Sequence, residues 1–578
     1  MSSSRTTTVL ALGALLAGPA LAHAQAAATR AAGAAPKPVL ELPLKHTGKP
    51  TTAAITPADL MTRVYVYADD SLMGRQVGTE YNLKAAAYIE REVRRLGLVP
   101  AGEAGGYYQN IPLFSNYVDS SATTLRIGTE ALVYAKDFLP IPRVGRTIPF
   151  DRAQVIYAGT NADSTTWPTA EAAAGKIVVI GVPAGASPVR GVLFSDKSRF
   201  AKAAAILVAS LDRIPAQVYP QIAHSTALRA DTVPNTSPTT ILVTPRVVSL
   251  LFDSLKAGAV GQPIAGTVTL REERAPGRNV VAILPGSDPA LKGQYVAIGA
   301  HNDHVGFNRA PADHDSVKAF MMVARPQGAD SPSGTPVTAD QSTRIRAVLD
   351  SLRKLRPARV DSIYNGADDD ASGSMSVLEI AEAFAGARVK PKRSILFVWH
   401  TGEEAGLFGS EHYTDHPTVP RDSIVAQLNM DMVGRGGAND ITGSAKEGGE
   451  LRGGPGYVQL VGSRRLSTEL GDLIEDVNKT NKLGLNFDYG IDANGHPQNI
   501  YCRSDHYMYA RYGIPVVFFT TGGHSDYHQV TDEPQYLDYG RMAQVATLVH
   551  DSAVRIANLD HRVVVDKPKP DPKGRCVQ

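Results

Sequence analysis

Short, uninterrupted apolar runs alternate with helical patterns in the second half of the chain. The runs lie at residues 279–284, 294–299, 395–399, 424–428 and 516–519. A run of this kind is typical of a strand that is buried on both faces of a parallel sheet. A helical pattern from about Ser374 to Phe384 separates two of the runs. The alternation therefore predicts an α/β core built on a mostly parallel sheet.

The first half of the chain has a different character. Two helical patterns, at about 56–67 and 79–97, come first. Short β-like runs separated by polar loops follow, and no cluster of histidines and carboxylates stands out among them. We interpret these runs as an inserted, non-catalytic domain. The predicted organisation is a flexible lead-in at 25–52, a core domain at 53–117 and 274–560, the insert at 118–273 and a loose tail at 561–578.

Residues 1–24 have the features of a secretory signal peptide. Arg5 gives a positive start, residues 9–21 are apolar, and the small residues around His23 form a cleavage site that ends at Ala24. The apolar stretch is too short for a membrane anchor, and no later segment is long enough to span a bilayer. We therefore expect an exported protein, periplasmic or extracellular, that is cleaved near Ala24.

Charge and cysteine content narrow the classes of function. The formal net charge is +2, and no basic run with interleaved aromatic residues is present, so a nucleic-acid partner is not expected. The cysteines, Cys502 and Cys576, are too few for a thiolate metal site, so any metal site must use histidine and carboxylate ligands. An exported protein can pair two cysteines in a disulfide, but the sequence does not determine whether these two are paired.

Residues that commonly bind metals collect where the predicted strands end. They are His301 with Asp303, Glu403 with Glu404, Asp431, and Tyr527 with His528, and Asp368 to Asp370 stand at a helix entrance. A single aspartate in such a place is more often a helix cap or a turn residue. Ligands, however, bind at the carboxyl ends of parallel strands, and this half of the chain offers no competing set. The groups together therefore indicate one site.

A pair of zinc ions would account for this combination of residues. Two ions a few ångström apart can clamp a carbonyl group and generate hydroxide near neutral pH. Each ion needs about three protein ligands and one open position. One carboxylate must then bridge the ions, and a further unligated carboxylate must move the proton.

The motifs resemble those of the co-catalytic dizinc exopeptidase family, which includes secreted bacterial leucyl aminopeptidases, aminopeptidase Y and glutamate carboxypeptidase II. The resemblance lies in HND at 301–303, GADDDASG at 366–373, TGEE at 401–404, NMDMVG at 429–434 and DYH at 526–528. Flanking motifs extend it over about 57–551. It implies a mixed, mostly parallel twisted sheet flanked by helices, with a mainly β insert that resembles a protease-associated domain.

The resemblance also implies a ligand set for two Zn²⁺ ions. Asp369 matches the bridging carboxylate, and the bond between Asp369 and Asp370 matches a peptide that is commonly cis in the family. Glu404 and His528 would complete one ion. His301 and Asp431 would complete the other.

The catalytic roles follow from the same resemblance. Glu403 would be the general base that takes a proton from the metal-bridging water and passes it to the leaving amine. Asp303 would hydrogen-bond to His301 and fix its tautomer. Tyr527 is similar to a tyrosine that steadies the oxyanion. His304 and His524 match no family ligand, and we expect them to be loop histidines.

The function implied is an exported aminopeptidase that removes N-terminal residues from peptides. An alternative on the same metal site is a carboxypeptidase or dipeptidase of the glutamate carboxypeptidase type, for which Arg309, Arg435 or Arg503 would bind a substrate carboxylate. A remote alternative is a non-catalytic binding protein, which predicts lost ligands. A polar excursion at about 308–359, longer than in compact family members, either covers the cleft or is a surface insertion. The sequence leaves open the preferred side chain, the oligomeric state and the physiological metal.

Overall fold

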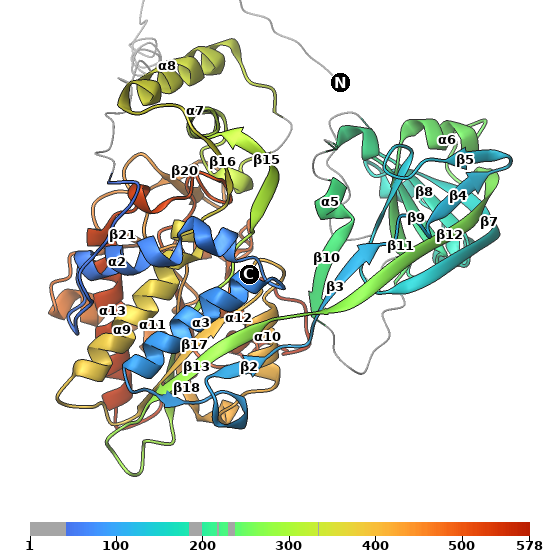
Figure 1. The fold of residues 1–578 in the computed structure, drawn as a ribbon. Helices are drawn as coiled ribbons and strands as arrows, with labels where there is room; N and C mark the ends of the chain where they lie inside the picture. The colour runs from blue at the N-terminus through green and yellow to red at the C-terminus, as the bar shows by residue number, and fades with distance from the viewer. Residues whose placement is uncertain (1–41, 184–198, 215, 217–218, 229–236, 333–334) are drawn as a thin grey trace, which may run out of the picture. The chain divides into compact units, whose positions relative to one another are not determined.

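The computed structural model describes residues 42–183, 199–214, 216, 219–228, 237–332 and 335–578 (Figure 1). The predicted signal peptide and the first part of the lead-in lie outside the described residues. Within the described residues, no helix has both the length and the apolar character that crossing a bilayer requires.

A nine-stranded mixed sheet carries the predicted apolar runs. Its order is β1-β13-β17-β14-β18-β23-β21-β22, with β2 beside β13. The strands are β1 (Val99–Pro100), β2 (Tyr108–Asn110), β13 (Arg278–Leu284), β14 (Tyr295–His301), β17 (Ser394–His400), β18 (Ile424–Met430), β21 (Tyr457–Val461), β22 (Asn486–Asp488) and β23 (Val516–Thr520). The neighbours β17, β14, β18 and β23 are parallel. β13 runs antiparallel to β17, and β21 runs antiparallel to β23 but parallel to β22. The predicted α/β class with a mixed sheet is confirmed.

Helices cover both faces of this sheet. They are α2 (Pro57–Tyr67), α3 (Glu80–Arg95), α9 (Gly373–Gly386), α10 (Phe408–Asp415), α11 (Thr468–Thr480), α12 (His506–Ala510) and α13 (Tyr539–Asn558). Alternate residues of β17 enter different cores: Phe397 packs in the core that contains residues of α2, α3, α9, α11 and α13, and Val398 packs in the core that contains residues of α10 and α12. Burial on both faces explains why the apolar run has no polar interruption.

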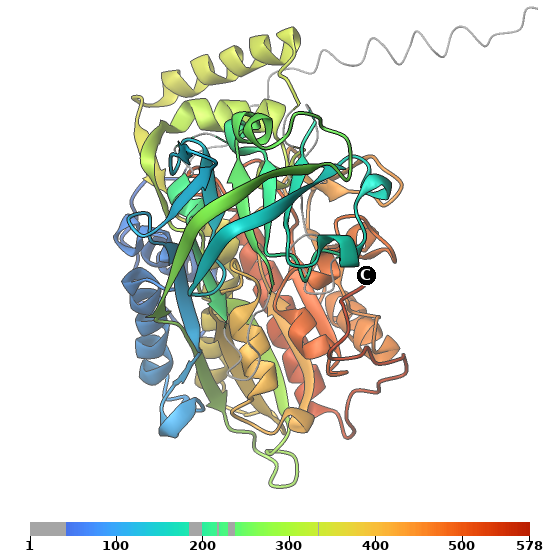
Figure 2. The same ribbon diagram turned by 90° about the vertical axis from the view of Figure 1, so that its right-hand side faces the viewer.

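A separate ten-stranded sheet occupies the predicted insert. Its order is β10-β3-β12-β7-β8-β9-β11-β6, with β4 beside β12 and β5 beside β4. The strands are β3 (Leu113–Val118), β4 (Thr124–Ile127), β5 (Glu130–Leu132), β6 (Phe138–Ile141), β7 (Arg146–Thr160), β8 (Ile177–Gly181), β9 (Ala205–Ala209), β10 (His224–Leu228), β11 (Thr239–Val243) and β12 (Val260–Ala275). The long strands β7 and β12 pair side by side, as Figures 1 and 2 show. Its relation to protease-associated domains stays a prediction.

The described residues of the predicted polar excursion form helices and strands within residues 307–363, the 307–363 segment. It consists of β15 (Phe307–Asp313), α7 (His314–Ala324), α8 (Ala339–Leu355) and β16 (Val360–Ile363). β15 and β16 pair antiparallel, so the helices are carried on a two-stranded stem.

The carboxyl end of the chain is attached to the residues around Tyr501. Cys502 and Cys576 form a disulfide, with their Cα atoms 5.9 Å apart. The side chain of Gln578 accepts a hydrogen bond from the backbone N–H of Tyr501 (2.9 Å) and donates one to the carbonyl of Ile491 (2.7 Å). The tail therefore ends beside residues that lie close to the candidate site.

Histidine 506, at the start of α12, is expected to make the protein sensitive to acid. It is fully buried and its ring stacks on Phe518, with centroids 4.8 Å apart. Burial lowers its pKa to about 3; Asp505 opposes the shift and Arg465 adds to it. Since an unfolded histidine titrates near 6.5, the unfolded state binds more protons between these values, and stability is lost as the pH falls below about 6.5.

We expect the titration of His506 alone to lower the free energy of unfolding by about 2 kcal/mol when the pH falls from 7 to 5. Urea titrations at both pH values, with chelator present so that metal release does not contribute, would measure the cost. His506→Met, which cannot titrate, should show a pH dependence weaker by that amount. Equal pH dependence in the two proteins would contradict the prediction.

Candidate metal centre

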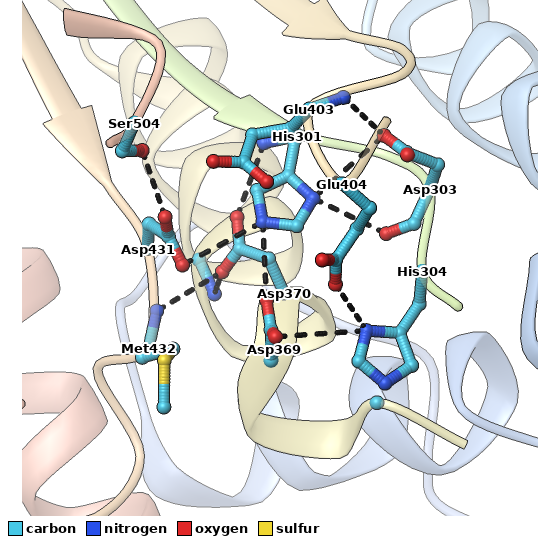
Figure 3. Close-up of polar contacts among 12 residues, drawn as sticks. His301, Asp303, His304, Asp369, Asp370, Glu403, Glu404, Asp431, Met432 and Ser504 are labelled. Atoms are coloured by element: carbon cyan, nitrogen blue, oxygen red, sulfur yellow. Dashed lines mark hydrogen bonds and ion pairs between the residues drawn. The ribbon is translucent and has the colours of Figure 1, made fainter. Parts of the chain in front are cut away.

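The parallel strands at the centre of the sheet deliver the predicted ligands to one place. β14 ends at His301, β18 is followed at once by Asp431, and the turn after β17 carries Glu403 and Glu404. Figure 3 shows these side chains converging on Asp369. The carboxyl ends of parallel strands form the ligand-binding edge of an open sheet, and here they form a cluster of histidines and carboxylates.

The cluster consists of two groups that share Asp369. One group contains His301, Asp369 and Asp431, and the other contains His304, Asp369, Glu404 and His528; in each, one ligand atom per residue lies within 4.8 Å of the others. Asp369 Oδ1 lies 3.2 Å from His301 Nε2, and its Oδ2 lies 2.9 Å from His528 Nε2. Each carboxylate oxygen therefore faces a different group, which is the arrangement that a bridging ligand requires.

The buried atoms of the cluster fit metal ions. His301 Nε2, His528 Nε2 and Asp431 Oδ1 have no hydrogen-bond partner among the described residues. Buried polar atoms are nearly always satisfied, so unpaired atoms that point at one another indicate a ligand between them. Imidazole nitrogens and carboxylate oxygens are suitable ligands for zinc.

Asp369, the predicted bridging residue, is held by its neighbours. The peptide bond between Asp369 and Asp370 is cis, as the resemblance implied. Asp370 accepts backbone N–H groups from His301 (3.1 Å) and Gly373 (2.8 Å). The Asp532 carboxylate accepts the backbone N–H of Asp369 (3.1 Å). Neighbouring side chains thus fix the backbone that carries the predicted ligands.

Contrary to the expectation, the Asp303 carboxylate hydrogen-bonds not to His301 but to the turn that carries Glu403. His301 Nδ1 lies 3.2 Å from the backbone carbonyl of Asp303 and 3.8 Å from its carboxylate. The carboxylate accepts the backbone N–H groups of Gly402 (2.7 Å) and Glu403 (3.1 Å). The carbonyl therefore fixes the histidine tautomer, and the carboxylate positions the turn that carries Glu403.

Glu403 stands apart from both groups of possible ligands. It lines a pocket that also contacts Asp369 and Asp431. Burial raises the pKa of its carboxyl well above the usual range, and His301 opposes the shift. A carboxylate next to the possible ligands but outside both groups is available to exchange protons.

The interpretation of His304 as a loop histidine is wrong. Its side chain is buried, and Nδ1 lies 2.7 Å from Glu404 Oε1, across a sequence separation of 100 residues. It therefore belongs to the group that contains His528. The signal was present in the sequence HNDH, which places a second histidine in the turn after the same strand.

His524 lies in a loop, as expected, but its side chain is not exposed. It is fully buried, and its Nε2 lies 3.1 Å from Asp368 Oδ2. Tyr527 lines the pocket, stacks on His528 with ring centroids 4.0 Å apart, and accepts a hydrogen bond from Arg503 (3.4 Å).

Comparison with known proteins finds a peptidase family and relatives that are named as enzymes. Residues 279–553 match the model described as Peptidase family M28. The "Leupeptin-inactivating enzyme 1" of Streptomyces exfoliatus is 29% identical over 181 residues, which cover 31% of this chain and 34% of that protein. The "Leucine aminopeptidase 1" of Ajellomyces dermatitidis is 27% identical over 262 residues, which cover 43% and 61%. The chain thus spans about a third to three fifths of the length of these curated relatives.

A solved structure is similar over most of its length. It is titled "Aminopeptidase from Aneurinibacillus sp. strain AM-1", with 17% sequence identity and a TM-score of 0.49, and the match covers 89% of this chain and 97% of that one.

Proposed function

We propose that the protein, whose residues 279–553 match the model described as Peptidase family M28, is an exported zinc aminopeptidase that hydrolyses the N-terminal bond of peptides. The observation that carries the proposal is the shared Asp369, whose two oxygens face His301 and His528 separately, beside an unligated Glu403. Relatives whose names describe leucine aminopeptidases support the same reaction.

Two zinc ions are the proposed cofactors. His301 and Asp431 would hold one, Glu404 and His528 would hold the other with His304 beside them, and Asp369 would bridge. When bound, the ions would polarise the scissile carbonyl and lower the pKa of a water molecule.

The residues of the chain that surround the ligands supply the proton transfer and the orientation. The Glu403 carboxylate takes a proton from the attacking water and returns it to the leaving amine. Asp303 keeps this carboxylate in the pocket by holding the Glu403 backbone N–H. The Tyr527 hydroxyl donates to the oxygen that gains charge during attack, and its ring is held by the stack on His528.

Recognition of a free amine is better supported than recognition of a carboxylate. Arg435 is paired with Asp526 (2.7 Å) and Asp440 (3.0 Å). Of the three arginines considered, Arg503 lines the pocket, and it is paired with Asp330 (2.8 Å). A carboxypeptidase needs an available cation. The non-catalytic alternative predicts missing ligands, and every predicted ligand and the base are present.

Export is part of the proposal. Residues 1–24 have the pattern of a signal peptide. The disulfide between Cys502 and Cys576 is consistent with an oxidising compartment.

Short peptides with free or acetylated N-termini, and with free or amidated C-termini, test the reaction. We expect turnover that acetylation and chelator abolish, that added zinc restores and that C-terminal amidation leaves intact. Loss of turnover on amidation, with acetylated peptides still cleaved, would favour the carboxypeptidase instead. Zinc binding without chelator-sensitive turnover of any peptide would refute both enzymes and favour the binding protein.

A further inference from the structure

The pocket beside the cluster of histidines and carboxylates has a largely uncharged lining. Met432, Ile491, Ile500 and Phe518 give it apolar surface, and amide, hydroxyl and glycine residues supply most of the rest. Glu403 lies on the same lining, so a substrate positioned for proton transfer would extend into this pocket.

The 307–363 segment supplies part of the pocket wall. Gln327 and Asp330, from the turn that follows α7, are both lining residues. The backbone N–H of Ala329 donates to the carbonyl of Tyr527 (3.1 Å). Gly328 has a φ of +57°, and a Cβ there would lie 2.5 Å from the same carbonyl, so the close approach requires glycine. The segment is therefore more than a surface insertion.

A buried ion pair holds the segment against the cluster of histidines and carboxylates. Lys318, on α7, lies 2.7 Å from Asp526 Oδ2, and both side chains are buried. Burial alone would raise the pKa of the Asp526 carboxyl, but Lys318 and Arg435 hold it well below the usual range. Asp526 is two residues from His528, so α7 is fixed to the loop that carries a predicted ligand.

The same turn also brings a negative charge to Arg503. Arg503 Nη1 and Nη2 lie 2.8 and 3.1 Å from the two oxygens of Asp330, a two-point contact. Apart from Asp369, Asp431 and Glu403, the Asp330 and Arg503 side chains are the only charged ones among the described residues that line the pocket. The segment thus neutralises a cation that would otherwise face the substrate.

We propose that the Asp330–Arg503 pair sets the charge selectivity of this pocket, so that the enzyme accepts uncharged side chains and discriminates against acidic ones. The inference rests on the proposed peptidase function. An unpaired arginine in a partly enclosed pocket attracts carboxylates. A paired one leaves an acidic side chain without a partner, and burying an unpartnered charge is unfavourable.

The experiment compares kcat/KM for peptides that differ only in one side chain, Leu, Gln, Glu or Lys, at the first or second position. Asp330→Asn keeps the size of the side chain and removes its charge. It should raise the Glu-to-Leu ratio of kcat/KM about tenfold, the size of one hydrogen bond to a charged group. Arg503→Gln should instead raise the Lys-to-Leu ratio.

The double variant Asp330→Asn/Arg503→Gln has neither charge, and it should return both ratios to those of the wild type. Asp350→Asn, on the exposed side of α8, makes the same charge change in the same segment and should leave the ratios unchanged. Because ratios are compared, a general loss of rate through the contact of Arg503 with Tyr527 does not affect the result.

An active wild type whose Glu-to-Leu ratio is unaltered by Asp330→Asn would overturn the charge-selectivity proposal and leave the peptidase intact. A wild type that cleaves no peptide in the panel would overturn the proposed function, and this inference with it.

Discussion

Glu403→Gln should lower kcat by about 10²–10⁴-fold while leaving the bound zinc unchanged. Glutamine keeps the shape of the side chain but cannot accept the proton of the attacking water. Glu403 belongs to neither group of possible ligands, so its replacement removes no metal contact. Steady-state kinetics on a peptide with N-terminal leucine, together with the zinc content of the dialysed protein, measure the two effects.

The neighbouring residue is the matched control. Glu404→Gln makes the same chemical change one residue away, but Glu404 Oε2 lies 2.9 Å from His528 Nε2. This variant should lose zinc as well as activity, and excess zinc should restore part of the rate. If Glu403→Gln lost zinc to the same degree, Glu403 would be a ligand, and the general base would have to be another group.

The strands that carry the site could be predicted from the sequence because they are buried on both faces of the sheet. β17 is covered on both faces, so its sequence from Ile395 to Trp399 is apolar without interruption. A strand end is where the apolar run stops, and His301 and Asp431 stand at such ends. Local patterns therefore located the edge of the sheet where ligands meet.

Partners distant in the sequence could not be predicted in the same way. Whether His304 reaches Glu404, or Lys318 reaches Asp526, depends on how a turn and a helix pack after folding. Local sequence also cannot show that His301 bonds to the carbonyl of Asp303 rather than to its carboxylate, because both acceptors belong to one residue. The resemblance gave the ligand types, and the packing determined their supports.

The 307–363 segment shows the same limit for specificity. Its polar composition was compatible with either a cover for the cleft or a surface insertion. Three contacts favour the first interpretation, because they hold the segment beside the pocket. They are Lys318 with Asp526, Ala329 with Tyr527, and Asp330 with Arg503. Each joins the segment to a residue about 170 or more positions later in the chain, so no local pattern could reveal it.

Asp369→Asn should prevent binding of both proposed metal ions at once and lower kcat by about 10³-fold or more, because the ions would supply both carbonyl polarisation and water activation. The two Asp369 oxygens face His301 and His528 separately, whereas a neutral amide offers one oxygen and no charge. His301→Gln and His528→Gln change one group each and serve as matched controls. Zinc titration of the metal-free proteins, followed by direct metal analysis, would measure how many ions each variant holds.

The number of metal ions bound by each variant distinguishes a bridging ligand from a ligand that binds a single ion. The wild type should bind two equivalents tightly, each histidine variant should retain one tight site, and Asp369→Asn should retain neither. The geometry requires this order, because each histidine lies in one group while Asp369 lies in both. If Asp369→Asn kept one tight ion, Asp369 would belong to a single group, and a wild type with one tight ion would reduce the proposed centre to a single metal.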